Sequence, residues 1–381
     1  MNPLRPKSAF LGFLRQRPVA LLAVAVIAIT VAVAIFAYPL SPDPSPHANR
    51  MILELGARPP GFRQMSFLVP ARRERAQPSL RGKALLDGWH SPYDQVPIEG
   101  WIANDEGIAL LHYVDEGMTD TLFYSYEALQ IPDAKVQDKT ALASYINQER
   151  VREIYYPLGS DQFGRDILSR LLVGTRISLS VGVIAVLLSL SIGIILGSLA
   201  GYFGGWVDEI VMWFINVLWS IPTLLLVFAI TLTLGKGFWQ IFIAIGLTMW
   251  VGAARLIRGQ VKSLKEMDYV LAARSLGASP FRIIRRHLWP NMAGPIMVIA
   301  AANFAAAILI EAGLSFLGIG VQPPQPSWGL MIKEHYNFLL TNKPFMALVP
   351  GAAIMLLVLS FHILGNAFRD YFDVRDTPRQ S

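Results

Sequence analysis

The stretch Ile177–Ala200 reads ISLSVGVIAVLLSLSIGIILGSLA and contains no charged residue. At 1.5 Å per residue, about 20 apolar residues cross the roughly 30 Å hydrocarbon core of a membrane. Five other apolar runs have comparable lengths and lie at Val19–Tyr38, Ile210–Leu234, Phe238–Ile257, Ala293–Gly313 and Phe345–Ala367. The sequence therefore predicts an all-α polytopic membrane protein with six transmembrane helices.

The composition of the whole chain supports this prediction. Of 381 residues, 53% are hydrophobic and 16% are charged, whereas an average soluble domain carries roughly 25% charged residues. The net charge of +6 comes from basic residues that gather beside apolar runs, where membrane orientation accounts for them. No nucleic-acid recognition module is present in the sequence, so we expect no nucleic-acid partner. The absence of cysteine excludes disulfides and thiolate chemistry.

The first apolar run, Val19–Tyr38, predicts a retained signal-anchor helix. A cleavable signal peptide has an apolar core of about 7–15 residues, and this run is longer and ends at Tyr38-Pro39. The basic residues before it place the N-terminus in the cytoplasm: Arg5, Lys7, Arg15 and Arg17. Six crossings then return the C-terminus to the cytoplasm.

Four regions follow from these runs. Residues 1–40 form the cytoplasmic N-terminus and anchor helix, 41–157 an extracytoplasmic insertion, 158–373 the membrane domain with five helices, and 374–381 a cytoplasmic tail. The insertion opens with a proline-rich linker, Ser41–Pro46. Short apolar stretches at Ile108–Val114 and Thr121–Tyr124 predict strands, so we expect a small β or α/β fold. The basic stretch that contains Arg72, Arg73 and Arg75 is interpreted as a loop.

Two short patterns in the sequence concern the packing and the ends of the expected helices. Gly193 and Gly197 have the small-xxx-small spacing that lets membrane helices approach closely. Asp208 and Glu209 stand at an expected helix start, where acidic side chains complement the helix dipole.

The loop 262–291 between the fourth and fifth runs is basic and too long for a tight turn. A short helix ending at Gly277 is expected, because glycine fits the left-handed position after a helix. Ser279-Pro280 then starts a second helix, with serine as the cap and proline in the first turn. That helix separates Ile283, Ile284 and Leu288 from Arg282, Arg285 and Arg286. It is either a helix lying on anionic lipid or a docking element for a soluble partner.

Polar and aromatic residues mark the region after the fifth run. Glu311 is an acid inside an expected membrane segment, which indicates a functional path, a paired ion or a structural hydrogen bond to a neighbouring helix. The prolines of Gln322–Pro326 prevent a helix, so a fixed loop is predicted at an outer mouth. This loop either gates the path and contacts a binding protein, or only anchors the helix end. Trp328 suits the membrane interface.

Three motifs carry a resemblance to a known family. Ala272-Ala273, Gly277 and Pro290 have the spacing of the loop that fits into the ATPase cleft in ABC importer permeases. The family pattern is Glu-Ala-Ala, three residues, Gly, nine residues, then Ile-x-Leu-Pro. This chain has Leu271, His287 and Trp289 at three of its positions. The missing glutamate removes any polar contact that it would make to the ATPase.

Two further stretches narrow the resemblance to the C-type permease of dipeptide, oligopeptide and nickel importers. They are PLGSDQFGRDILSR at 157–170 and EAGLSFLGIGVQPPQPSWG at 311–329. The resemblance covers about Tyr156–Asp373, and Val19–Tyr38 corresponds to the extra first helix of that family. The long insertion lies outside it.

The resemblance implies a type I ABC importer permease in a bacterial inner membrane, a transport subunit and not an enzyme, which moves peptides or similar small solutes. It implies a second homologous permease in a heterodimer, two cytoplasmic ABC ATPase subunits, an extracytoplasmic substrate-binding protein, and contact with lipid. No cofactor is expected in this chain, since ATP and magnesium would be bound by the ATPase. The implied ATPase-coupling residues are Asp268, Ala272, Ala273, Gly277, Ser279 and Pro290. The expected path or gate residues are Glu311, Ser315, Gln322, Pro323 and Trp328.

Other chemistry is not supported by the sequence. The string Leu234–Phe238 lacks the spacing and the hydroxyl of a phosphate-binding loop. The six histidines are scattered, so we expect no metal ligands and no catalytic residues. A proton-coupled secondary carrier that depends on Glu311 stays open as an alternative, as does a receptor or scaffold that uses the insertion. The cargo and the role of the insertion are not fixed by the residues.

Overall fold

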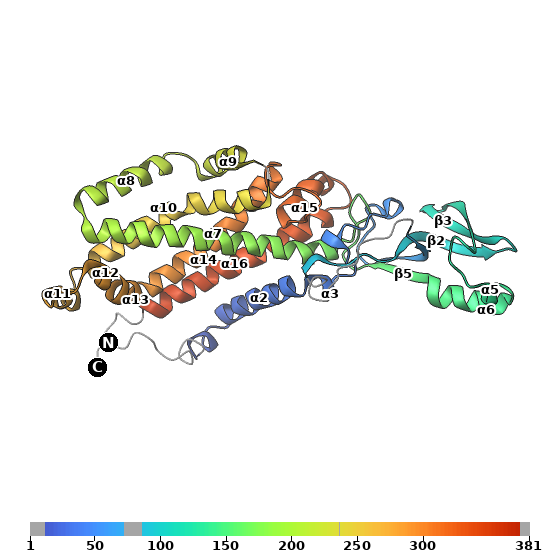
Figure 1. Ribbon diagram of the computed structural model, residues 1–381, viewed down its shortest axis with the longest axis horizontal. Helices are drawn as coiled ribbons and strands as arrows, with labels where there is room; N and C mark the ends of the chain where they lie inside the picture. The colour runs from blue at the N-terminus through green and yellow to red at the C-terminus, as the bar shows by residue number, and fades with distance from the viewer. Residues whose placement is uncertain (1–11, 72–85, 236, 374–381) are drawn as a thin grey trace.

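The computed structural model describes residues 12–71, 86–235 and 237–373 as an elongated molecule, with a helical bundle at one end and a small sheet at the other (Figure 1). The long helices are α2 (Pro18–Ile35), α7 (Ile167–Phe203), α8 (Gly205–Trp219), α9 (Thr223–Leu234), α10 (Phe238–Leu264), α14 (Ala293–Phe316) and α16 (Phe345–Asp373). The short helices are α3 (Ala37–Leu40), α5 (Asp133–Val136), α6 (Lys139–Tyr145), α11 (Asp268–Ser275), α12 (Pro280–Ile283), α13 (Trp289–Asn291) and α15 (Trp328–His335). The strands are β1 (Phe62–Pro70), β2 (Tyr93–Ala103), β3 (Gly107–Asp115), β4 (Met118–Ser125) and β5 (Val151–Tyr156).

The predicted fold class is confirmed. Within the described residues, five helices are long and apolar enough to cross a membrane, and α8 with α9 makes a sixth span if the bent pair counts as one. The helices of the bundle run side by side along the long axis of the molecule (Figure 1). The helices α2, α10, α14 and α16 begin within one residue of the predicted starts, whereas α8 begins five residues earlier, at Gly205, and α7 begins ten residues earlier, at Ile167.

The run Ile210–Leu234 was expected to be one helix, and the structure corrects this. It forms α8 and α9, which meet at an angle of 92°. Pro222 stands directly before α9, and a proline has no N–H to donate to the preceding turn. The Ser220 N–H still donates to the Asn216 carbonyl at 3.1 Å, but Pro222 has no N–H with which to continue this ladder, so the chain turns sharply before α9 begins.

Glycines on α7 let it pack closely against α10. A methyl group at Gly193 would lie 2.6 Å from the Ala253 Cβ, and one at Gly197 would lie 2.5 Å from the backbone oxygen of Ala254. Contacts at such distances require one helix to move. The small-xxx-small spacing read from the sequence therefore brings these two backbones together.

This contact gives a testable expectation. Gly197→Ala should destabilise the chain by about 1–3 kcal/mol, because the added methyl meets backbone that cannot rotate away. Gly252→Ala on α10 is the matched control, since a methyl group added there would have nothing within 4 Å. Thermal denaturation in detergent measures both variants. Equal melting temperatures for the two would contradict the close packing.

The insertion contains a five-stranded antiparallel sheet in the order β4-β3-β2-β1-β5. The strands predicted at Ile108–Val114 and Thr121–Tyr124 are β3 and β4. One sheet face packs on α6 through a core that includes Phe67, Ile108 and Leu142. The predicted loop with Arg72, Arg73 and Arg75 lies outside the described residues.

Hydrogen bonds attach the insertion to the start of α7. The N–H of Ala57 donates to the Asp161 backbone oxygen at 2.7 Å. The Ser160 hydroxyl donates to the Leu55 carbonyl oxygen at 2.5 Å, and the N–H of Asp43 donates to the Ser169 hydroxyl at 2.8 Å. The linker is therefore fixed against the membrane domain by its backbone.

The other end of the bundle holds α11, α12 and α13. The start of α2 and the end of α16 lie at this same end (Figure 1), where Arg17 forms an ion pair with Asp370. The sheet lies at the opposite end. The basic helix-turn-helix and the sheet of the insertion therefore lie at opposite ends of the molecule.

Candidate functional site

The segment α11–α13 is a helix-turn-helix attached to the end of α10. Gly277 has φ +78°, the left-handed conformation expected after α11. Its N–H donates to the Arg274 carbonyl at 3.0 Å, and the Ala278 N–H donates to the Ala273 carbonyl at 3.1 Å. Pro280 occupies the first turn of α12. The predicted turn is therefore present, and only the cap differs: Ser279 makes no side-chain cap hydrogen bond.

One face of this segment anchors it to the membrane domain. Val270, Ile283, Ile284 and Leu288 pack against Ile257 and Val261 of α10. The arginines of α12 and of the π-helical turn Ile284–Leu288 that follows it are exposed, as the sequence pattern predicts. A buried apolar face on one side makes the segment a rigid extension of α10.

The opposite face is exposed and partly apolar. Leu276, at the tip of the turn, is 89% exposed, and Phe281 is 69% exposed. Among the predicted coupling residues, Ala273 is half-buried and the others are exposed: Asp268, Ala272, Gly277, Ser279 and Pro290. Large apolar side chains that are exposed at a protruding turn indicate a surface that binds a partner protein.

The departure from the family pattern at Trp289 has a packing explanation. Its indole N–H donates to the hydroxyl of Ser198 on α7 at 3.0 Å. This bond ties the second helix to the bundle, a role that leucine at that position would not supply.

Glu311 lies at the centre of a small hydroxyl cluster near the end of α14. Its side chain is fully buried, and Oε1 accepts a hydrogen bond from the Ser315 hydroxyl at 2.7 Å. The Ser327 hydroxyl lies 3.5 Å from that of Ser315, which also accepts the N–H of Val321 at 3.1 Å. No basic side chain pairs with Glu311, and its Oε2 has no hydrogen-bond partner among the described residues. Two of the predicted path residues, Glu311 and Ser315, are therefore in direct hydrogen-bond contact.

The other predicted path residues are placed differently. Gln322 and Pro323 are exposed in the loop after α14, where helix was not expected. Trp328, which the sequence predicts at the membrane interface, is 3% exposed within the protein, and its indole N–H donates to the Leu171 carbonyl at 3.0 Å. The ring fills the space left by Gly174 of α7. Trp328 therefore locks α15 against α7.

A buried ion network near these residues was not predicted. Arg165 donates to Asp161 at 2.5 Å and to Glu334 Oε2 at 2.9 Å, and Arg170 donates to the same Glu334 oxygen at 3.1 Å. Arg170 is 1% exposed. The network joins the motif at 157–170 to Glu334 of α15, the helix that begins at Trp328 within the second motif. The charges of Asp161, Arg165 and Arg170 in the first motif are the sequence signal that could have indicated this network.

The same network corrects the expectation that the scattered histidines exclude a metal-ligand cluster. Asp161, Glu334 and His335 offer ligand atoms within 4.8 Å of one another. Both carboxylates, however, already accept hydrogen bonds from arginine. His335 donates from Nδ1 to the Met331 carbonyl, and burial lowers its pKa. The two guanidinium groups thus balance the charges of the two carboxylates, and the imidazole stays neutral.

Asp208 lies in the first turn of α8, where its charge was expected to complement the helix dipole. Its main partners are instead on α10. It accepts a hydrogen bond from Arg258 at 2.6 Å and one from Lys262 at 2.7 Å. The pair ties the outer helix α8 to α10 beside the helix-turn-helix.

Comparison with known proteins identifies the family to which this chain is similar. The sequence pattern of the family described as "Binding-protein-dependent transport system inner membrane component" matches residues 193–375. A glutathione transport system permease protein of Pectobacterium atrosepticum is 40% identical over 233 residues, which cover 60% of this chain and 77% of that protein. A dipeptide transport system permease protein of Bacillus subtilis is 43% identical over 215 residues, or 56% of this chain and 67% of that protein. A chain of the inward-facing MetNI methionine ABC transporter has a TM-score of 0.43 and 19% identity, covering 54% of this chain and 97% of that chain.

The first of these relatives is 40% identical to this chain, and the match covers 77% of that relative's own length. Family membership makes the protein a multi-pass transport subunit of the inner membrane, with ATP hydrolysis on partner ATPase subunits and delivery by a binding protein. This chain belongs to the family of inner-membrane permease components of binding-protein-dependent ABC importers.

Proposed function

We propose that this chain is one of two related permeases whose helices together form the path for a peptide-like solute. The relatives named for dipeptide and glutathione transport support that class of cargo. Two cytoplasmic ATPases and an extracytoplasmic binding protein complete the proposed complex, in which ATP and magnesium are bound by the ATPases. The observation that carries the proposal is the rigid segment α11–α13, which presents Leu276 and Phe281 at the end of the molecule opposite the sheet.

The proposed orientation places that end in the cytoplasm. The starts of α2 and α11 and the end of α16 lie there together (Figure 1), and the residues around them are basic. Closure of the ATPases would then move α11–α13, and α10 would transmit the movement to α7 through their close contact. Such coupling requires two conformations of the bundle. ATP and cargo must each stabilise one of these conformations more than the other.

The outer residues have a proposed role at the opposite end. Glu311 and Ser315 form a polar cluster behind the loop that contains Gln322 and Pro323. In this proposal the cluster holds the loop in place at the outer mouth, and the exposed loop contacts the binding protein.

Affinity purification of the intact complex, followed by mass spectrometry, tests the assembly. We expect a second permease, ATPase subunits and a binding protein to be recovered together. Vanadate should stop uptake by the reconstituted complex, and a protonophore should not. Recovery of a homo-oligomer without an ATPase, with uptake stopped by the protonophore, would instead support a proton-coupled carrier that uses Glu311.

A further inference from the structure

Three arginines of the helix-turn-helix line one pocket. Arg282, Arg285 and Arg286, together with Phe281, surround a hollow of about 440 Å³ that is open at the surface. Positions three and four apart lie on the same face of a helix, so the three guanidinium groups share one side of the segment. The volume is within the roughly 300–1,000 Å³ of sites for small ligands. We refer to this hollow as the arginine pocket.

The segment that carries these arginines is held in place by its opposite face. Ile283 and Leu288 are fully buried, and Ile284 is 4% exposed. These three side chains pack against Ile257 and Val261 at the end of α10. The segment cannot rotate without exposing them to water, so the arginines stay directed away from α10.

The positive charges of the arginine pocket are not balanced within the described part of the chain. Arg282, Arg285 and Arg286 form no hydrogen bond or ion pair with any residue that the structure describes. Like charges at this spacing repel one another and destabilise a helix. A negatively charged ligand would remove that repulsion, so the arginine pocket suits an anion.

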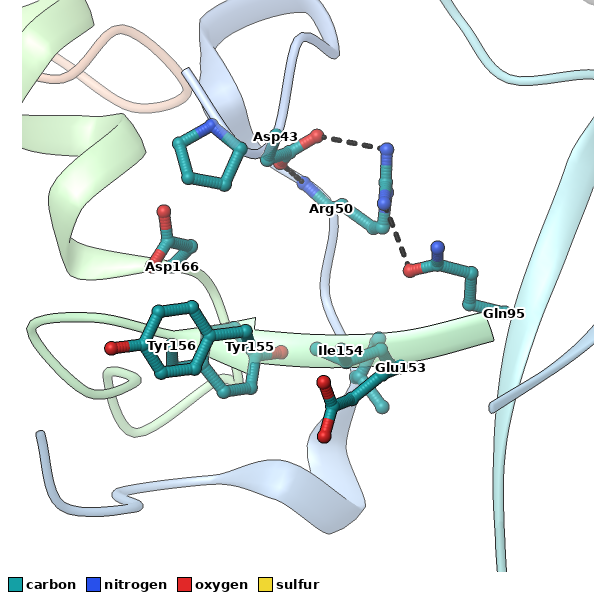
Figure 2. Close-up of a pocket in the computed structure, with 10 residues that line it drawn as sticks. Asp43, Arg50, Gln95, Glu153, Ile154, Tyr155, Tyr156 and Asp166 are labelled. Atoms are coloured by element: carbon teal, nitrogen blue, oxygen red, sulfur yellow. Dashed lines mark hydrogen bonds and ion pairs between the residues drawn. The ribbon is translucent and has the colours of Figure 1, made fainter. Parts of the chain in front are cut away.

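Basic side chains in comparable positions do have acidic partners. In the pocket where the insertion meets the start of α7, Arg50 pairs with Asp43 at 3.2 Å and donates to Gln95 at 2.8 Å (Figure 2). At the same end of the bundle as the arginine pocket, Arg258 donates to Asp208 at 2.6 Å. Unpaired arginines are therefore a local feature of this one face.

The arginine pocket lies beside the end of α7, at the level expected for lipid headgroups. The stretch of α7 from Ile177 to Phe203 carries no charge. At 1.5 Å per residue it extends about 40 Å, close to the thickness of a bilayer with its headgroup regions. The rings of Phe281 and Phe203 lie 6.5 Å apart between centroids, and Trp289 donates to Ser198 at 3.0 Å. The arginines therefore lie beside the last turns of this stretch, and Figure 1 shows α12 and α13 nearer the bundle than α11.

We propose that the arginine pocket binds the headgroup of an anionic phospholipid, such as phosphatidylglycerol, from the bilayer leaflet at this end of the bundle. The lipid phosphate accepts hydrogen bonds from the guanidinium groups, whose planar geometry suits two phosphate oxygens at once. Phe281 provides an apolar contact for the start of the acyl chains. An anionic headgroup is preferred over a zwitterionic one because three positive charges face the site. The inference goes beyond the proposed function, since it requires a bilayer and no ATPase.

Native mass spectrometry of the full chain in dodecyl maltoside, titrated with palmitoyl-oleoyl phosphatidylglycerol, tests the site. We expect binding of this lipid, and at least tenfold weaker binding of phosphatidylcholine with the same acyl chains. The triple variant Arg282→Gln, Arg285→Gln and Arg286→Gln should bind phosphatidylglycerol roughly 100-fold more weakly, because each basic residue near the membrane surface strengthens binding about fivefold. The three side chains are exposed, so this variant should keep its melting temperature.

Three controls separate the pocket from general electrostatics. The first removes three exposed positive charges from the insertion, by Arg63→Gln, Lys139→Gln and Arg152→Gln, and binding should then change less than about twofold. The second is Arg274→Gln on α11, which is exposed and does not line the pocket. It should weaken binding less than Arg285→Gln, for which about fivefold is expected. The third replaces the pocket arginines with lysine, and binding should stay within about tenfold because the charge remains.

An acidic surface of an ATPase subunit is the alternative partner for these arginines. If the triple glutamine variant no longer recovered the ATPase but bound phosphatidylglycerol as tightly as the unaltered chain, that alternative would be supported and the proposal overturned. Equal binding of the two lipids, displacement of the lipid by an equal concentration of inorganic phosphate, or equal losses in Arg285→Gln and Arg274→Gln would also overturn it. Failure to recover any ATPase would contradict the proposed function and leave lipid binding unchanged.

Discussion

Transport should fall by roughly tenfold or more when three glycines are inserted after Gly277, in line with coupling energies of about 1–3 kcal/mol between linked sites. The insertion would separate α11 from α12 at the exposed tip formed by Leu276. Each helix would keep its own contacts with α10, but the pair would no longer move as one body. Uptake by the reconstituted complex, measured with ATP hydrolysis, reports this change.

The chain provides a matched control for this insertion. Gly117, in the turn between β3 and β4, has φ +74°, and a methyl group added at either Gly117 or Gly277 would have nothing within 4 Å. The same insertion at Gly117 should leave uptake near its original rate. ATPase subunits that still bind the Gly277 variant, but hydrolyse ATP without uptake, would show that the turn transmits movement. Unchanged uptake together with unchanged ATPase binding would refute the coupling role.

Glu334→Gln should lower the melting temperature of the chain by about 10 °C. The carboxylate accepts hydrogen bonds from the buried guanidinium groups of both Arg165 and Arg170. Without its charge, Asp161 alone would balance two buried cations. Breaking a buried ion pair costs about 3–5 kcal/mol, and a kilocalorie shifts the melting temperature by about 2–4 °C in a domain of this size. Thermal denaturation in detergent measures the shift.

Glu116→Gln is the control for this second prediction. Glu116 also pairs with an arginine, Arg58 at 3.3 Å, but its side chain is 84% exposed. Water screens such a pair, so its loss should leave the melting temperature nearly unchanged. If the two variants melted at the same temperature, the network would not stabilise the contact between α7 and α15.

Much of the membrane domain could be predicted from the sequence because the deciding properties are local. An apolar run long enough to cross the bilayer needs only its own residues to form a helix, so the runs became α2, α7, α10, α14 and α16. The turn at Gly277 also depends on local geometry, since glycine and proline restrict the backbone wherever they stand. The family motifs were readable for the same reason, as fixed residues at fixed spacing.

The tertiary structure alone decided how distant residues meet. Asp161 and Arg165 lie more than 160 residues before Glu334, and the sequence offers many other partners for each of their charges. The burial of Trp328 depends on the space beside Gly174 of α7. Helix formation needs contacts within one segment, whereas ion pairs, buried rings and pockets arise only when packing brings separate segments together and excludes water between them.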